Sequence, residues 1–138
     1  MSAAGTSGKT VLLIEDDQDD RRYWALLLRS QCPHYLVLEA ADAQSGLDIC
    51  RHQKVDCILL DLDLPDSSGF RVLLDLIPDR TAPQIAVIVL TRLLSSVLHE
   101  LAMHNGAHAC LIKGRTSVAM LDQAIQKAVE SVKRTSPN

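Results

Sequence analysis

Acidic side chains follow two short apolar runs of the sequence. Glu15 and Asp16 come directly after VLLI, and Asp61 and Asp63 fall within the first three positions after CILL. Crowded carboxylates repel one another and raise each other's pKa. A hard divalent cation relieves that repulsion, and Mg²⁺ prefers oxygen ligands while keeping several waters. These residues therefore predict a magnesium site, provided that the two runs meet in the fold.

Two further polar side chains end apolar runs later in the chain. Thr91 closes IVLT, and Lys113 follows CLI. A carboxylate beside Mg²⁺ can attack a phosphoryl donor and form an acyl phosphate, and the transferring group spreads negative charge over three oxygens. Lys113 can neutralise one of those oxygens, and the Thr91 hydroxyl can donate to another. The residue types thus favour phosphoryl transfer to a carboxylate, and they match neither a Ser-His-Asp triad nor a Walker loop.

Five apolar runs, short and rich in branched residues, have the character of strands. Most are continuous rather than alternating, as is typical of strands that are buried on both faces. The runs are Val11–Ile14, Tyr35–Leu38, Cys57–Leu60, Ile85–Leu90 and Cys110–Ile112.

The segments between these runs have helical spacing. Apolar residues recur at i, i+3, i+4 and i+7 over 70–77 and again over 94–101, and more loosely over 118–128. Two more helices are expected around Trp24 and Leu47, and Gly106 fits the C-terminal cap of the fourth helix. Strand and helix therefore alternate five times, which predicts an α/β fold with a doubly wound parallel sheet. Ligands of such sheets bind outside the carboxyl ends of the strands, where the acidic residues, Thr91 and Lys113 fall.

Length and composition limit the organisation of the chain. The 138 residues fit one domain, expected over 9–133, with a flexible segment over 1–8 and a tail or linker over 134–138. A net charge of −3 argues against an electrostatic nucleic-acid binder. No apolar run approaches the roughly 20 residues of a membrane span. The four cysteines show no CxxC spacing, so a reduced, cytoplasmic setting is expected.

The motifs VLLIEDD, CILLDLDLPDSSG, IVLT and CLIKG together resemble the receiver domain of two-component response regulators. The resemblance covers roughly residues 9–133. It implies a flavodoxin-like fold with five parallel strands in the order 2-1-3-4-5. Members of this family take a phosphoryl group from a partner histidine kinase or histidine phosphotransfer protein. They catalyse much of the transfer and the later hydrolysis themselves, so no activity as a stand-alone enzyme is expected.

The resemblance also implies a metal-binding role for each acidic residue. Asp61 matches the phosphoacceptor, which is also a metal ligand. Asp16 matches the direct Mg²⁺ ligand of the acidic pair, and Glu15 matches its partner, which acts through water. Asp63 matches the position whose backbone carbonyl completes the metal site.

The same resemblance assigns the switching residues and a partner surface. Thr91 matches the hydroxyl that turns toward the phosphoryl group, and Lys113 matches the lysine that pairs first with the acceptor and then with the phosphate. The usual partner surface of the family is formed by the fourth helix, the fifth strand and the fifth helix. This surface implies a partner contact or a homodimer that depends on phosphorylation.

Three positions depart from the commonest form of the family. Cys110 stands where many receivers carry Tyr or Phe, so output through a rotating ring is doubtful. Arg92 replaces a small residue after Thr91, and we expect it to pair with Asp63 or to point to solvent, with an effect on phosphoryl access or lifetime. Gly114 replaces a proline that often follows a cis bond. A cis bond without proline costs about 3 kcal/mol, so a trans bond is expected.

Other polar residues near these motifs have simpler interpretations. Asp17, Asp19 and Asp20 could enlarge the acidic site, but solvated side chains that favour the N-terminal end of the first helix are the preferred interpretation. Ser67 and Ser68 are interpreted as a helix N-cap rather than as modification sites.

Two alternative functions remain open on the sequence. Asp61 and Asp63 match the Asp-x-Asp spacing of haloacid-dehalogenase-like phosphatases, in which the first Asp is the nucleophile and the second the acid/base. That motif belongs after the first strand, and here it follows the third. A receiver-like interaction module without phosphorylation is the other alternative, and the complete set of polar residues argues against it.

Overall fold

The computed structural model describes residues 8–66, 69–77 and 85–135, and the predicted cap at Ser67 and Ser68 lies outside them. Within these residues, strands and helices alternate along the chain, as predicted. The elements are β1 Thr10–Ile14, α1 Gln18–Gln31, β2 Leu36–Ala40, α2 Ala43–His52, β3 Cys57–Leu60, α3 Gly69–Leu76, β4 Ala86–Thr91, α4 Ser96–His104, β5 Ala109–Ile112, η1 Lys113–Arg115 and α5 Val118–Thr135.

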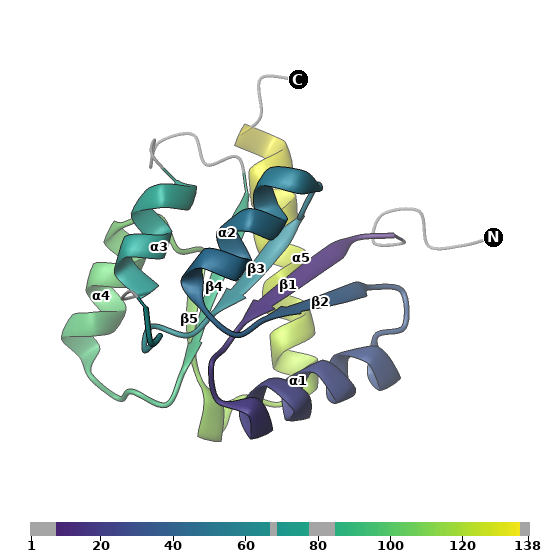
Figure 1. The fold of residues 1–138 in the computed structure, drawn as a ribbon, viewed down its shortest axis with the longest axis horizontal. Coiled ribbons are helices and arrows are strands. Elements are labelled where there is room, and N and C mark those ends of the chain that lie inside the picture. The colour runs from purple at the N-terminus through teal and green to yellow at the C-terminus, as the bar shows by residue number, and fades with distance from the viewer. Residues whose placement is uncertain (1–7, 67–68, 78–84, 136–138) are drawn as a thin grey trace.

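The strands form one parallel sheet in the order β2-β1-β3-β4-β5 (Figure 1). This order confirms the expected doubly wound fold, with β1 and β3 on either side of the point where the order reverses. Helices α1 and α5 cover one face of the sheet, and α2, α3 and α4 cover the other. The carboxyl ends of β1, β3, β4 and β5 therefore open onto one edge of the molecule.

Successive residues of each central strand pack into opposite halves of the core. In β1, Val11 and Leu13 face α1 and α5, whereas Leu12 and Ile14 face α2 and α3. Because side chains alternate along a strand, a strand that is covered on both faces needs an apolar residue at every position. This requirement explains the continuous apolar runs in the sequence.

Helix α4 differs from the expectation for residues 94–101. The helix begins at Ser96, with the Ser95 side chain accepting a hydrogen bond from the backbone N–H of Leu98. Leu94, which was expected in the helix, precedes it and is exposed. Gly106 follows the helix with a φ of 106°, which confirms the predicted glycine cap.

The apolar stripe of α4 is also largely uncovered. Val97, Leu101 and Met103 are exposed, and Ala102 is the residue by which α4 enters the core. The apolar spacing thus corresponds to a helix, as predicted, but most of its apolar face does not pack against the sheet.

None of the described helices is both long and apolar enough to cross a membrane. All four cysteines carry free thiols.

Candidate functional site

The register of the sheet brings the two acidic motifs together. Ile14 of β1 pairs with Leu60 of β3, so Glu15 and Asp61 leave adjacent strands at the same level. The backbone N–H of Asp61 donates to the carbonyl of Ile14 at 3.1 Å, which continues the pairing by one residue. The two acidic motifs therefore meet in the fold, which was the condition for a magnesium site.

Three carboxylates converge at this edge. One oxygen from each of Glu15, Asp16 and Asp61 lies within 4.8 Å of the other two. Glu15 is 2% exposed and Asp61 is 8% exposed, whereas Asp16 is exposed. The three line a pocket of about 260 Å³. Because a hard divalent cation binds through carboxylate oxygens and retains waters, this donor set fits Mg²⁺.

Lys113 lies at the centre of this pocket. Its Nζ donates to Asp61 Oδ2 at 3.0 Å, to Asp20 Oδ2 at 2.9 Å and to Glu15 Oε1. Burial alone would lower the pKa of Lys113, but the hydrogen bonds to Glu15 and Asp20 outweigh it and raise that pKa. The ammonium group is therefore held charged next to the carboxylate of Asp61.

The Glu15 carboxyl group titrates at an unusually high pH. Burial raises its pKa and the charge of Asp61 raises it further, while the hydrogen bond from Lys113 lowers it, which leaves the pKa at about 7. The cost of removing a carboxylate from water thus exceeds the gain from its ion pair. A cation bound in this pocket would compete with that proton.

Thr91 and Asp63 lie on the walls of the same pocket. Thr91 is buried, and its Oγ1 accepts a hydrogen bond from the backbone N–H of Leu93 at 3.2 Å. The backbone N–H of Asp63 donates to Asp61 Oδ1 at 3.1 Å, while the Asp63 side chain is exposed. Both oxygens of Asp61 are therefore fixed, one by Asp63 and the other by Lys113.

Asp20 belongs to the site, which corrects the interpretation of this residue as a solvated helix-end charge. Its side chain is 15% exposed and binds both Lys113 and Arg92. The pKa of Asp20 is lowered, first by the hydrogen bond from Arg92 and then by Lys113. Asp17 caps α1, with its Oδ1 accepting from the N–H of Asp20. Helical spacing offered no signal for Asp20, because Asp16 and the N-cap Asp17 both precede α1, which begins at Gln18.

The expected pairing of Arg92 with Asp63 is wrong, whereas the side chain is largely exposed to solvent, as the other expectation had it. Its Nε donates to Asp20 Oδ2 at 3.0 Å, and its Nη2 donates to Asp20 Oδ1. Its partner is therefore Asp20 on α1 rather than Asp63. Asp20 thereby holds the guanidinium at the wall of the pocket, and the Arg92 side chain is 69% exposed.

Gly69, the first residue of α3, fixes the loop after β3. A Cβ at this position would lie 2.5 Å from Leu62 Cα and 2.8 Å from the Asp61 carbonyl oxygen. The Gly69 N–H donates to the Leu62 carbonyl at 2.9 Å. The helix therefore lies directly against the backbone that carries Asp61, and this contact leaves no space for a side chain.

We expect Gly69→Ala to lower the free energy of unfolding by about 2 kcal/mol, because backbone atoms must move to admit the methyl group. The same movement displaces Asp61, so Mg²⁺ affinity falls as well. Urea denaturation and a Mg²⁺ titration measure the two effects. Gly114→Ala is the matched control, since a Cβ there meets nothing within 4 Å. Equal losses in both variants would show that the contact with Asp61 has no role.

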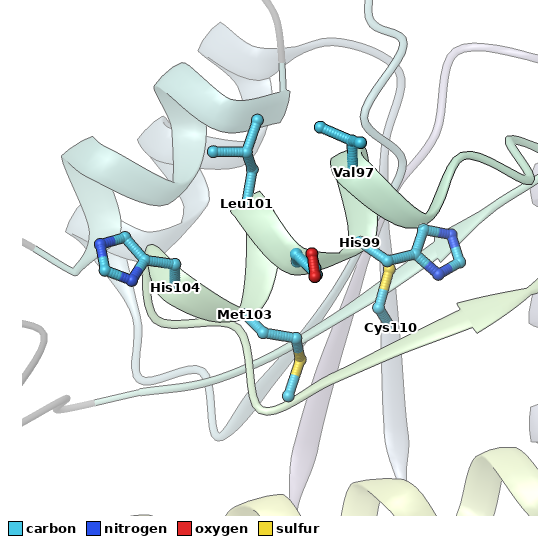
Figure 2. A pocket seen from close by; sticks show the side chains of 7 residues that line it. Val97, His99, Leu101, Met103, His104 and Cys110 are labelled. Atoms are coloured by element: carbon cyan, nitrogen blue, oxygen red, sulfur yellow. The ribbon is translucent and has the colours of Figure 1, made fainter.

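The other two departures in the sequence, Cys110 and Gly114, lie in β5 and directly after it. No cis peptide bond occurs among the described residues, so the bond before Gly114 is trans, as expected. Cys110 is half-buried and lines a hollow of about 920 Å³ together with residues of α4 (Figure 2). The hollow and the acidic pocket have no lining residue in common.

Comparison with known proteins agrees with this geometry. The family model described as the response regulator receiver domain matches residues 11–126. The transcriptional regulatory protein AfsQ1 of Streptomyces coelicolor is 33% identical over 104 residues, which cover 75% of this chain and 44% of AfsQ1. The chain spans less than half the length of the first curated relatives that it matches.

Two solved structures show the same architecture. A response regulator receiver domain of Clostridium thermocellum superposes with a TM-score of 0.80 at 27% identity, over 93% of this chain and 99% of that one. The receiver domain of the Pseudomonas aeruginosa sensor histidine kinase PA1611, with a magnesium ion coordinated in its active site cleft, has a TM-score of 0.76 at 24% identity, over 90% and 99% of the two chains. With the family model matching most of its length, the chain belongs to the response regulator receiver domain family.

Proposed function

We propose that this domain accepts a phosphoryl group on Asp61 and thereby switches a protein-interaction surface. The observation that carries the proposal is the position of Lys113, whose Nζ lies 3.0 Å from Asp61 Oδ2 inside a pocket of carboxylates. A fixed cation beside a nucleophilic oxygen is what a transferring phosphoryl group requires, because its charge is spread over its outer oxygens.

The acidic pocket supplies the ligands for Mg²⁺. Asp16 and Asp61 would bind the ion directly, the Asp63 backbone carbonyl would complete the protein ligands, and Glu15 would act through a water. When bound, Mg²⁺ neutralises the crowded carboxylates and the incoming phosphoryl oxygens. The spacing of the three carboxylates supports this assignment.

In the transfer step, a carboxylate oxygen of Asp61 forms a new bond to phosphorus while the bond between phosphorus and the donor nitrogen breaks. The electron pair of that bond stays on the imidazole of the donor histidine, which leaves as a neutral ring because its other nitrogen already carries a proton. Lys113 neutralises one phosphoryl oxygen. Thr91 gives up the hydrogen bond from the Leu93 N–H and turns its hydroxyl toward another.

The donor that we propose is a histidine kinase or a histidine phosphotransfer protein, in the cytoplasm. Membership of the receiver family supports a histidine donor in general. The free thiols of the four cysteines are compatible with a reducing compartment.

Labelling by a small phosphodonor, such as phosphoramidate, tests the function. The wild-type chain is expected to gain one phosphoryl group in a reaction that requires Mg²⁺ and stops with EDTA, as measured by intact mass. Asp61→Asn abolishes the labelling. Asp63→Asn is the matched control and keeps it, because we assign Asp63 a role through its backbone only.

The same pair of variants separates the two alternatives. A haloacid-dehalogenase-like phosphatase would turn over p-nitrophenyl phosphate and would lose that turnover in Asp63→Asn. An interaction module without phosphorylation would show no labelling of the wild-type chain at all. Either result would overturn the proposed function.

We propose that the face formed by α4, β5 and α5 carries the switched contact, with a second copy of the chain as the partner. The exposed Val97, Leu101 and Met103 and the hollow beside Cys110 support a surface of this kind (Figure 2). A contiguous apolar patch on a polar surface is typical of a protein interface.

Met103→Asp is expected to abolish phosphorylation-dependent dimerisation, because it places a charge in the apolar contact. Sedimentation of the phosphorylated protein measures the effect. Leu26→Asp, at an exposed apolar position on α1 and so outside the α4–β5–α5 face, is the matched control and leaves dimerisation intact. A phosphorylated wild-type chain that stays monomeric would refute the dimer.

A further inference from the structure

Asp20 binds two cations at once. Its Oδ2 accepts from both Lys113 Nζ at 2.9 Å and Arg92 Nε at 3.0 Å, and its Oδ1 accepts from Arg92 Nη2. The contact ties α1 to the segment between β4 and α4 and to the start of η1. One carboxylate therefore engages both of the basic side chains that line the acidic pocket.

Simple stabilisation of the helix end does not account for Asp20. The capping position of α1 is already filled by Asp17, and Asp19 supplies a solvated charge in the first turn. Asp20 instead turns inward and is mostly shielded from water. Its position suits an interaction with Lys113 and Arg92 rather than with the helix dipole.

The Asp20–Arg92 pair also forms a wall between two hollows. Asp20, Arg92 and Lys113 line the acidic pocket, and the same three residues line a neighbouring hollow of about 490 Å³ beside Trp24. The Arg92 side chain is therefore part of the wall that the two hollows share, and it is far more exposed to an incoming anionic donor than Lys113 is. Held bidentately by Asp20, it has its charge neutralised there.

We propose that Asp20 is a positioning residue of phosphoryl transfer: it restrains Arg92 and shares Lys113, so that both cations are partly withheld from the phosphoryl donor. Loss of the Asp20 charge frees Arg92 to act as a second cation for the phosphoryl oxygens. This inference rests on the proposed function. It assigns Asp20 and Arg92 a role that neither the acidic pair nor the phosphoacceptor fulfils.

The size of the effect follows from the exposure of the pair. Exposed ion pairs are weak, so Asp20 restrains Arg92 but does not lock it. A freed guanidinium in the wall of the pocket attracts an anionic donor, and the attraction weakens as salt is added. We expect Asp20→Asn to raise the second-order rate constant of labelling by phosphoramidate about fivefold at low salt.

The experiment is a double-mutant cycle at saturating Mg²⁺, with phosphoramidate as the probe. Arg92→Gln alone changes the rate constant little, because Arg92 is restrained in the wild-type chain. Asp20→Asn raises the rate constant, and adding Arg92→Gln to Asp20→Asn removes most of that increase. Asp20→Glu keeps the charge and is expected to retain the rate constant of the wild-type chain. Equal rate constants for Asp20→Asn and the double variant would overturn the role of Arg92, and an unchanged Asp20→Asn would overturn the proposal.

A spectroscopic measurement tests the restraint without any phosphoryl transfer. The Nε–H resonance of Arg92 is expected to be protected from exchange with water in the wild-type chain and in Asp20→Glu, and to lose that protection in Asp20→Asn. An unprotected Arg92 in the wild-type chain would contradict the restraint. If the wild-type chain is not labelled at all, the proposed function fails while this measurement still decides whether Asp20 holds Arg92.

Discussion

Replacing Lys113 by alanine is expected to lower the free energy of unfolding of the metal-free protein by about 3–5 kcal/mol at pH 8. The Lys113 side chain is 8% exposed and is the shared partner of Glu15, Asp20 and Asp61. Without it, three carboxylates face one another with no buried cation between them. The loss shrinks at low pH, where the carboxyl groups take up protons, and Mg²⁺ offsets part of it by binding the folded state.

The same variant is expected to slow phosphoryl transfer to Asp61 by about a hundredfold, the size of effect seen when one fixed charge-stabilising donor is removed. Urea denaturation with and without Mg²⁺ measures the stability, and intact-mass kinetics with phosphoramidate measure the transfer. Lys127→Ala, at an exposed position on α5, is the control and leaves both unchanged. A Lys113→Ala protein as stable as the wild type at pH 8 would contradict the central position of this lysine.

Glu15→Gln is expected to separate stability from metal binding. The pKa of Glu15 is raised by burial from its ordinary 4.5 to about 7, so the folded state binds more protons than the unfolded state between these values. The free energy of unfolding of the metal-free wild type therefore falls as pH rises from 4.5 to 7. The variant lacks this penalty and should be more stable than the wild type at pH 8, by on the order of 2 kcal/mol.

The affinity for Mg²⁺ is expected to fall in Glu15→Gln, whereas the stability of the metal-free protein rises. Mg²⁺ competes with the proton on Glu15, so the affinity of the wild type for Mg²⁺ should rise as pH increases toward 7 and then level off. Glu15→Gln should bind Mg²⁺ about tenfold more weakly, because the residue orients the ligand shell, and should lose this pH dependence. Trp24 lines the hollow beside Lys113 and offers a fluorescence readout. A Glu15→Gln protein that is less stable than the wild type at pH 8 and binds Mg²⁺ as tightly would contradict the role assigned to Glu15.

The strands and the acidic site could be predicted from the sequence because each depends on local pattern. Strands that are covered on both faces need continuous apolar runs, and parallel strands bring their carboxyl ends to one edge. Glu15, Asp61, Thr91 and Lys113 were placed by this argument alone, and the structure brings them into one pocket.

The Asp20–Arg92 contact could not be predicted in this way. The two residues lie 72 positions apart, and their pairing depends on how the start of α1 approaches the segment after β4. Asp63 was another acidic residue within reach of the Arg92 side chain, and reach alone did not distinguish Asp63 from Asp20 as its partner. The exposure of Val97 and Leu101 on α4 could not be predicted for a related reason. Apolar spacing of 3.6 residues predicts a helix, but whether its apolar face meets the sheet or a partner is decided by tertiary packing.

The position of the label tests the central claim most directly. The chain is labelled with phosphoramidate and Mg²⁺, the acyl phosphate is trapped by borohydride reduction, and the modified residue is identified by peptide mass spectrometry. The account predicts a single modified residue, Asp61, and no modification when EDTA is present. Modification at any other residue, or none in the folded, Mg²⁺-loaded protein, would contradict it.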